Sequence, residues 1–139
     1  MSGPNNIFEL GSQSMSAQMV RMNTLASNIA NAGTVASSPD TAYKALRPVF
    51  ETVYNDAKDN TNRLSTTRAV DVVALDREPE ALYRPDHPQA DKNGFVYAST
   101  VNVEEEMVEM LESSRQYQNT LEAVTTLRTL MARTVGMGK

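Results

Sequence analysis

The sequence predicts a mostly α-helical protein with a small β-rich middle, in which long helices form both ends of the chain. Five of the six prolines lie between residues 39 and 88, and both flanks lack interior proline. Proline interrupts a helix because it removes a backbone donor and clashes with the preceding turn. Apolar residues recur in both flanks at steps of three, four and seven, the spacing of one helix face. These observations predict an N-terminal helical segment at 1–33, a β-rich or irregular middle at 34–101 and a C-terminal helical segment at 102–139.

The N-terminal flank predicts a helix from about Asn6 to Ala32, with a length of roughly 40 Å. Asn6 followed by Glu9 has the spacing of a capping box, in which each side chain satisfies a free backbone amide. Gly33 follows the periodic segment, and glycine can adopt the left-handed conformation that closes a helix. The apolar face of this helix comprises Phe8, Met15, Met19, Met22, Leu25 and Ile29.

The C-terminal flank predicts a second helix from about Val103 to Thr134, roughly 45–50 Å long. Asn102 and Glu105 have the spacing of a second capping box. Acidic residues crowd the first turns and basic residues lie near the end, so both complement the helix dipole; these residues are Glu104, Glu105, Glu106, Glu109, Glu112, Arg128 and Arg133. The apolar face comprises Val103, Met107, Met110, Tyr117, Leu121, Val124, Leu127 and Met131.

The middle predicts short strands joined by turns. Residues rich in valine and aromatic side chains favour strands at Pro48–Tyr54, Ala69–Leu75 and Gly94–Ala98. The pairs His87-Pro88 and Asn93-Gly94 indicate turns. The polar stretch from Asn55 to Thr67 is expected to form a mobile loop.

Each long helix must bury its apolar face, because an isolated helix gains most of its stability from such packing. The middle has too few large apolar residues to cover both helices along their full length. Two arrangements therefore remain open at this point. The helices can pack on each other within one chain, or each can pack against other subunits.

The composition excludes several functional classes. The chain contains no cysteine, which excludes disulfides, a thiol nucleophile and thiolate metal ligands. With 13 basic and 17 acidic residues the net charge is -4, which argues against nucleic-acid binding and gives no reason to expect binding to anionic membranes. No apolar run is long enough to span a membrane, and Met1 to Met15 lack the pattern of a signal peptide. These features predict a cytosolic protein, unless a dedicated machine exports it.

No residue set predicts catalysis, and we expect no enzyme, metal or cofactor site. His87 is the single histidine and lies in a turn-like stretch, so a structural role is expected. The acidic cluster Glu104–Glu106 could hold a cation, but its position at a helix start favours an interaction with the dipole. Asp71 and Asp76 have no obvious partners and are expected to be solvated.

One segment resembles a known family. The decapeptide from Leu25 to Thr34, LASNIANAGT, is similar to the N-terminal signature of the flagellar axial proteins, which form the rod, hook and hook-associated parts. Within it the matching residues are Ala26, Ser27, Asn28, Ala30 and Asn31. Further along, Tyr83–Pro88, Ala90–Val96 with Asn93 and Gly94, and Ser114–Gln118 resemble the short subunits of the proximal rod.

The resemblance implies a structural subunit of the bacterial flagellar basal-body rod. Such a chain is expected to leave the cell through the flagellar type III export apparatus without a cleaved signal peptide. It is expected to assemble with itself and other rod subunits, on the periplasmic side of the inner membrane, into a helical tube that transmits torque. Its terminal helices would pair in a coiled-coil-like assembly layer, which favours burial between subunits, and no membrane insertion is implied. The alternatives are a different axial protein of the same family, a secreted helical adaptor, or a small hydrolase that would depend on His87.

Overall fold

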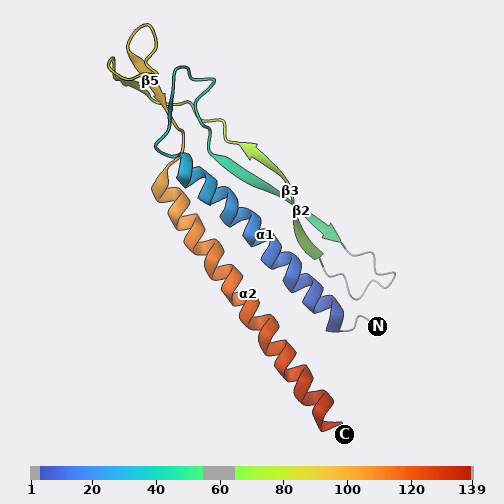
Figure 1. Cartoon of the computed structure of the whole chain (residues 1–139). Coiled ribbons are helices and arrows are strands. Elements are labelled where there is room, and N and C mark those ends of the chain that lie inside the picture. The colour runs from blue at the N-terminus through green and yellow to red at the C-terminus, as the bar shows by residue number, and fades with distance from the viewer. Residues whose placement is uncertain (1–3, 55–64, 139) are drawn as a thin grey trace.

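The computed structural model describes residues 4–54 and 65–138, and two long helices dominate it (Figure 1). Helix α1 (Pro4–Asn31) and helix α2 (Val103–Met137) are joined by five strands. These are β1 (Val35–Ala36), β2 (Leu46–Tyr54), β3 (Ser65–Ala74), β4 (Ala81–Tyr83) and β5 (Phe95–Ala98). The prediction of two terminal helices around a small β-rich middle is therefore confirmed.

Helix α1 begins and ends differently from the prediction. It begins at Pro4, so Asn6 lies inside the first turn and the expected capping box is wrong. Proline suits this position because the first helical amides have no partner within the helix. At the other end, Gly33 does not adopt the left-handed conformation, since only Gly94 has a positive φ among the described residues. The carbonyl of Asn31 instead accepts hydrogen bonds from the backbone amide and hydroxyl of Thr34, at 3.2 and 2.7 Å.

Helix α2 has the predicted N-cap. The side-chain oxygen of Asn102 accepts hydrogen bonds from the amides of Glu104 and Glu105, at 3.0 and 3.2 Å. The reciprocal half of the capping box is replaced, because the Glu105 carboxylate bonds to Arg77 at 3.0 Å. The helix ends at Met137, three residues later than predicted, so Arg133 lies before its last turn.

Strands β2 and β3 form a long antiparallel hairpin that runs alongside α1 (Figure 1). Pairing continues from Leu46 opposite Ala74 to Tyr54 opposite Ser65, with a bulge between Val49 and Phe50. Both predicted strands are confirmed and are longer than expected. The loop predicted at Asn55–Thr67 is wrong at its end, since residues 65–67 belong to β3. Its remaining part, 55–64, lies outside the described residues.

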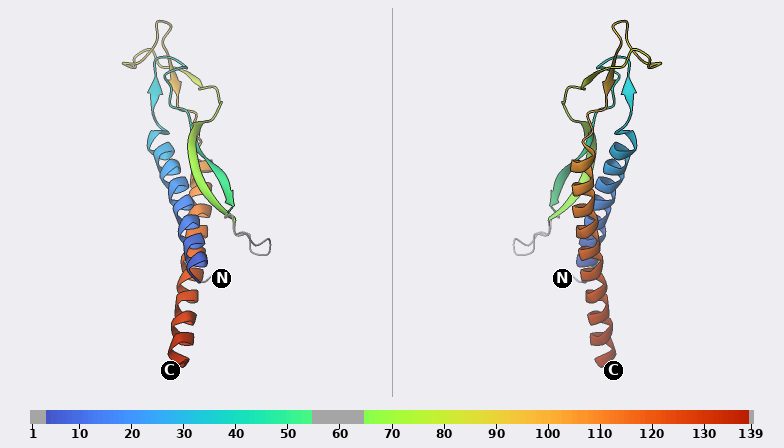
Figure 2. Two further views of the ribbon diagram at one scale, coloured as in Figure 1. Left: turned by 90° about the vertical axis from the view of Figure 1, so that its right-hand side faces the viewer. Right: turned by 90° about the vertical axis from the view of Figure 1, so that its left-hand side faces the viewer.

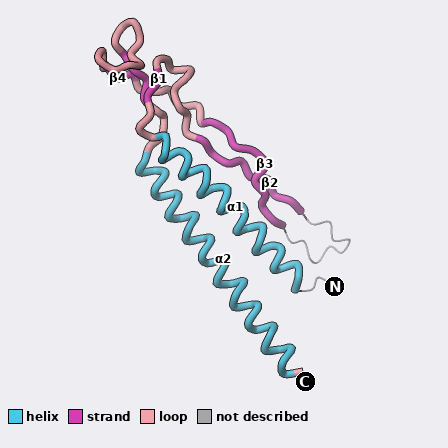
Figure 3. Tube along the Cα trace, in the orientation of Figure 1, coloured by secondary structure: helices cyan, strands magenta, loops and turns pink. Residues whose placement is uncertain are grey.

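The other three strands form a small antiparallel sheet of order β1-β5-β4 at one end of the molecule (Figure 3). Strand β5 was predicted, whereas β1 and β4 have only two and three residues and leave no periodic signal. The predicted turn at Asn93-Gly94 is confirmed. Gly94 has a φ of 82°, and the Asp91 carboxylate accepts hydrogen bonds from the amides of Asn93 and Phe95, both at 2.8 Å. The ring of His87 stays within its own turn and accepts a hydrogen bond from the amide of Gln89.

The two helices pack antiparallel against each other within one chain, which realises the first of the two open arrangements (Figures 1 and 2). The resulting shape is elongated, with the small sheet at one end and the C-terminus of α2 at the other (Figure 2). The apolar core is small, and among the described residues its buried members are Ala17, Leu25, Ala42, Ala45 and Val96. Many large apolar side chains of α2 remain exposed.

Candidate functional site: the helix pair and its polar junction

The predicted apolar faces are only partly covered by the packing of α1 on α2. Leu25 is fully buried within the chain. Nine of the predicted residues are half-buried, namely Phe8, Met15, Met22, Ile29, Met110, Tyr117, Val124, Leu127 and Met131. Four are exposed, namely Met19, Val103, Met107 and Leu121, with 44%, 39%, 59% and 46% of their surface accessible. Packing within the single chain therefore covers most of the predicted apolar residues in part, and it leaves the last four exposed to solvent.

A glycine lets the two helices approach closely near the start of α1. A Cβ atom on Gly11 would lie 2.5 Å from Cγ2 of Val124 on α2. Real carbon atoms do not approach so closely, so this position needs a residue without a side chain. Glycine lowers the intrinsic stability of a helix, so local preference gives no reason for Gly11, and the contact that requires it was not predicted.

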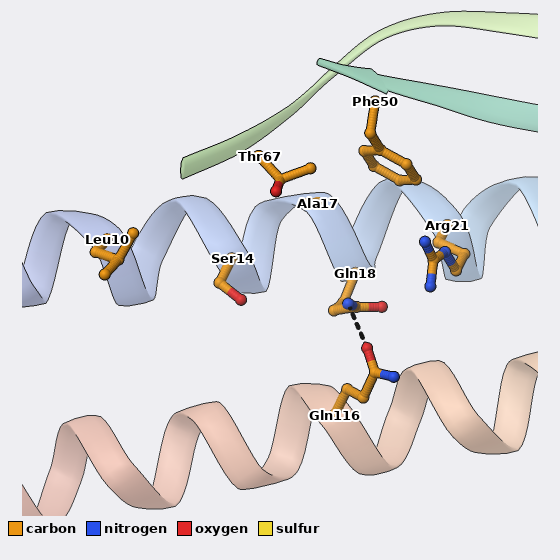
Figure 4. A pocket seen from close by; sticks show the side chains of 8 residues that line it. All are labelled: Leu10, Ser14, Ala17, Gln18, Arg21, Phe50, Thr67 and Gln116. Atoms are coloured by element: carbon orange, nitrogen blue, oxygen red, sulfur yellow. Dashed lines mark hydrogen bonds between the residues drawn. The ribbon is translucent and has the colours of Figure 1, made fainter. Parts of the chain in front are cut away.

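A pair of glutamines links the middles of the helices. Nε2 of Gln18 donates a hydrogen bond to Oε1 of Gln116 at 2.8 Å, and the two side chains point toward each other (Figure 4). A pocket of about 320 Å³ opens beside them, between the helices and the hairpin. Its lining is Leu10, Ser14, Ala17, Gln18, Arg21, Phe50, Thr67 and Gln116. The guanidinium of Arg21 lies 5.0 Å from the centre of the Phe50 ring, which favours a cation–π contact between α1 and the hairpin.

Asn28 is the centre of a buried polar cluster where the hairpin starts. Its amide group donates to the carbonyl of Leu46 and to Oε2 of Glu106, both at 2.9 Å. Its oxygen accepts from the amide of Leu46 at 2.9 Å and from the hydroxyl of Tyr43 at 3.1 Å. A carboxamide offers two donors and two acceptor positions, so Asn28 uses its full capacity. Asn28 thus fixes the first residue of β2 through both of its backbone polar groups.

Glu106 completes this cluster from α2. Nη1 of Arg47 lies 2.7 Å from Oε1 of Glu106 and donates a hydrogen bond to Oε2 at 3.0 Å. The contact with Oε1 is an ion pair, and Oε1 accepts no hydrogen bond from the described residues. Arg47 also lies 3.4 Å from the carboxylate of Glu109. We call Asn28, Tyr43, Leu46, Arg47 and Glu106 the polar junction, because they connect α1, the hairpin and α2.

The contacts of the polar junction matter for stability because two of its side chains are buried. The side chains of Asn28 and Glu106 are 0% and 1% exposed. A carboxylate without partners is very unfavourable in such a place, whereas one with a cation and a second donor is tolerated. The three elements can therefore satisfy Glu106 in few relative positions, which fixes the hairpin against the helix pair.

Sequence reasoning found Asn28 through the motif but missed its partners. Glu106 was assigned to the helix dipole together with Glu104 and Glu105, yet only those two are exposed. Glu106 lies on the side of α2 that faces α1, at the spacing of seven residues from Ser113, which is also buried. That spacing was a usable signal, because a charged residue in line with the helix contact predicts a buried partner.

The other motif residues have local roles. Nδ2 of Asn31 donates to the carbonyl of Ser27 at 2.8 Å, and the Ser27 hydroxyl lies 3.4 Å from that of Tyr43. Ala26 and Ala30 are exposed on α1. Asn93 and Gly94 form the turn before β5, in the part of the chain that carries the small sheet (Figure 3).

The described residues form neither a cluster of metal ligands nor a membrane-spanning helix. In residues 4–54 and 65–138, no three His, Cys, Asp or Glu side chains gather as metal ligands would. Neither α1 nor α2 has a stretch that is apolar enough and long enough to cross a membrane. Asp71 and Asp76 are exposed, as expected.

Comparison with known proteins gives the family. The family model described as flagella basal body rod protein matches residues 9–35, and the one described as flagellar basal body rod FlgEFG protein C-terminal matches residues 92–137. The flagellar basal-body rod protein FlgC of Yersinia enterocolitica is 34% identical over 134 residues, which are 96% of this chain and 97% of the relative. The protein of the same name from Salmonella typhimurium is 32% identical over the same shares of both chains.

The similarity extends to a distant relative. The FlgC protein of Aquifex aeolicus is 31% identical over 129 residues, which are 93% of this chain and 92% of the relative. These relatives are structural rod proteins and not an enzyme family. The resemblance predicted from the sequence is confirmed, and the chain belongs to the family of the flagellar basal-body rod protein FlgC.

Proposed function

We propose that this chain, a structural subunit of the flagellar basal-body rod, polymerises through its terminal helices into the tubular shaft that transmits torque. Membership of the FlgC family carries the rod assignment. The observation that supports assembly through the helices is the set of large apolar side chains that α2 leaves exposed. A contiguous apolar surface of this kind on a folded chain favours a protein partner.

Four of the exposed apolar residues of α2 lie within about a quarter turn of one another around the helix. Val103, Met107 and Leu111 follow each other at steps of four, and Leu121 returns to the position of Val103 after five turns. This side differs from the one that packs on α1, which carries Glu106 and Ser113. Burying one such side chain between subunits contributes about 1.5–3 kcal/mol. A contact repeated from subunit to subunit without closing on itself then gives a helical polymer.

The polar junction suits a subunit that carries mechanical load. It connects the hairpin to both helices through hydrogen bonds and an ion pair in which the Glu106 side chain is buried. The hairpin and the two helices would therefore move together, so torque applied to the hairpin would be transmitted to the helix pair. In this role the chain needs neither a catalytic group nor a cofactor. His87 has a structural role, because its ring accepts a hydrogen bond within its own turn.

We further propose a place in the proximal rod, on the periplasmic side of the inner membrane. The partners are other rod subunits and further copies of this chain. The route is export by the flagellar type III apparatus without a cleaved signal peptide and without insertion into the membrane. The terminal helices would form a coiled-coil-like layer inside the tube, with the β-rich middle outside it.

The test uses the source organism. The gene is deleted, basal bodies are isolated, and both steps are repeated with the gene restored. We expect a non-motile deletion strain without rods, and restored basal bodies that contain the chain. A deletion strain that swims with normal flagella would refute the proposal. If the chain is a different axial protein, the deletion strain would form rods that stop at a later point of assembly. If it is a secreted adaptor, the chain would be found in soluble stoichiometric complexes and not in basal bodies.

A further inference from the structure

Helix α2 extends beyond α1 at the C-terminal end (Figures 1 and 2). The contacts Asn28–Glu106 and Gln18–Gln116 define one antiparallel register, since ten residues along α1 match ten along α2. Continuing this register brings Pro4, the first described residue of α1, opposite Leu130. The segment from Leu130 to Met137, which we call the overhang, therefore reaches past the described part of its partner helix.

The overhang is an apolar and basic surface. Leu130, Val135 and Met137 have 54%, 72% and 86% of their surface accessible. Leu130, Arg133 and Met137 follow at steps of three and four, so they share one side of the helix. The overhang contains one arginine, Arg133, and no acidic residue. Two turns of helix with this composition are unfavourable in water and gain stability from a partner.

The opposite end of the same helix carries the complementary chemistry. Residues 103–112 contain five glutamates and no basic residue. Met107, Val108 and Leu111 are 59%, 69% and 62% accessible, and Glu104 lies one turn before them on the same side. The family model that matches this helix is described for FlgEFG proteins, so other axial proteins share the element. A second copy of this chain can thus offer an apolar helix face bordered by carboxylates.

We propose that the overhang docks on the carboxylate-bordered helix start of an adjacent rod subunit, a surface of the kind that residues 104–111 form in this chain. The apolar residues would meet in the centre and Arg133 would meet a carboxylate at the border. The contact runs from the end of one helix to the start of the next, so it repeats along the rod axis. The inference rests on the proposed function, because it assumes that the chain assembles into the rod.

Arg115 provides a matched control for Arg133. Both are exposed arginines of α2, and 18 residues, five full turns, place them on the same side of the helix. Only Arg133 belongs to the overhang. In basal bodies from strains that carry R133E or R115E, we expect R133E to reduce the amount of chain at least fivefold and R115E to leave it within twofold. Export of both variants, measured as free chain outside the cytoplasm, should equal that of the unsubstituted chain.

A second measurement identifies the docked surface. Basal bodies with R133K or R115K are treated with a carbodiimide, which joins an amine to a carboxylate in direct contact by forming an amide, while the carbodiimide takes up the elements of water and leaves as a urea. We expect a new product with R133K, above the background of the unsubstituted chain, in which mass spectrometry finds the amine joined to a Glu or Asp in the first turns of a neighbour's helix. Equal products from R133K and R115K, or attachment outside a helix start, would overturn the inference. Absence of the unsubstituted chain from basal bodies would instead overturn the proposed function.

Discussion

Asn28 of α1 and Glu106 of α2 are 78 residues apart in the chain, yet their side chains are hydrogen-bonded at 2.9 Å and fully buried. The amide of Asn28 also holds both backbone polar groups of Leu46, and the carboxylate of Glu106 also holds Arg47. One contact therefore joins the end of α1 and the start of α2, and it also fixes the start of the hairpin. This arrangement gives the motif asparagine a physical role in shaping the subunit.

Replacement of Asn28 by alanine should destabilise the free chain strongly. It would leave the amide of Leu46 without its side-chain acceptor and the carbonyl of Leu46 with Arg47 as its remaining side-chain donor, and it would remove a donor from Glu106. Each buried polar group left unsatisfied costs about 1–3 kcal/mol, so we expect the free energy of unfolding to fall by about 2–3 kcal/mol. Urea unfolding followed by circular dichroism measures it. Asn23→Ala, at an exposed position of the same helix, is the control and should change stability by less than about 0.5 kcal/mol.

The buried ion pair should matter more than the exposed one beside it. Glu106→Gln leaves Arg47 facing a neutral amide in a site where Glu106 is 1% exposed. Breaking a buried pair costs about 3–5 kcal/mol when the remaining charge is fully buried, and Arg47 retains some solvent contact, so we expect about 2–3 kcal/mol.

The matched control for this prediction is Glu105→Gln. Glu105 and Arg77 form an ion pair in which both side chains are nearly half exposed, and such pairs contribute about 0.2–1 kcal/mol. Chemical unfolding of both variants compares the two positions directly. Equal losses would show that the Glu106 carboxylate is not held in the polar junction as the structure has it.

The regular elements could be predicted from the sequence, whereas the polar junction could not. Periodicity and proline placement report local preference, and they gave α1, α2 and the strands of the hairpin to within a few residues. Strands β1 and β4 form only because β5 lies between them, so their pairing is a tertiary effect. Glu106 resembles its exposed neighbours Glu104 and Glu105 in sequence, and its different role depends on Arg47, 59 residues earlier. The predicted N-terminal capping box of α1 was wrong because the spacing of Asn6 and Glu9 does not fix where the helix begins, and the helix begins before Asn6.

Gly11 should tolerate no side chain. In Gly11→Ala the new methyl group would lie 2.5 Å from Cγ2 of Val124, so the helices must separate. Overpacking of this kind costs about 1–3 kcal/mol, and we expect a net loss of stability even though alanine favours a helix by about 1 kcal/mol over glycine. Thermal unfolding should show a rescue in the double variant Gly11→Ala/Val124→Ala, which removes the obstructing methyl groups. Gly136→Ala meets no atom within 4 Å and should be neutral or stabilising, so a loss at Gly136 as large as that at Gly11 would contradict the close approach.

Leu121→Asp should separate folding from assembly. Leu121 is 46% exposed in the single chain, so a charge there remains hydrated and should change the free energy of unfolding by less than about 0.5 kcal/mol. In the proposed rod the same side chain lies between subunits, where a carboxylate without a partner is strongly unfavourable. We therefore expect normal export, no rods and no swimming, measured in a strain that carries only the variant. The control Asn119→Asp adds the same charge at another exposed position of α2 and should support swimming. Normal rods from Leu121→Asp would show that this side of α2 is not an interface between subunits, and failure of both variants would show that the rod does not tolerate added negative charge on α2 in general.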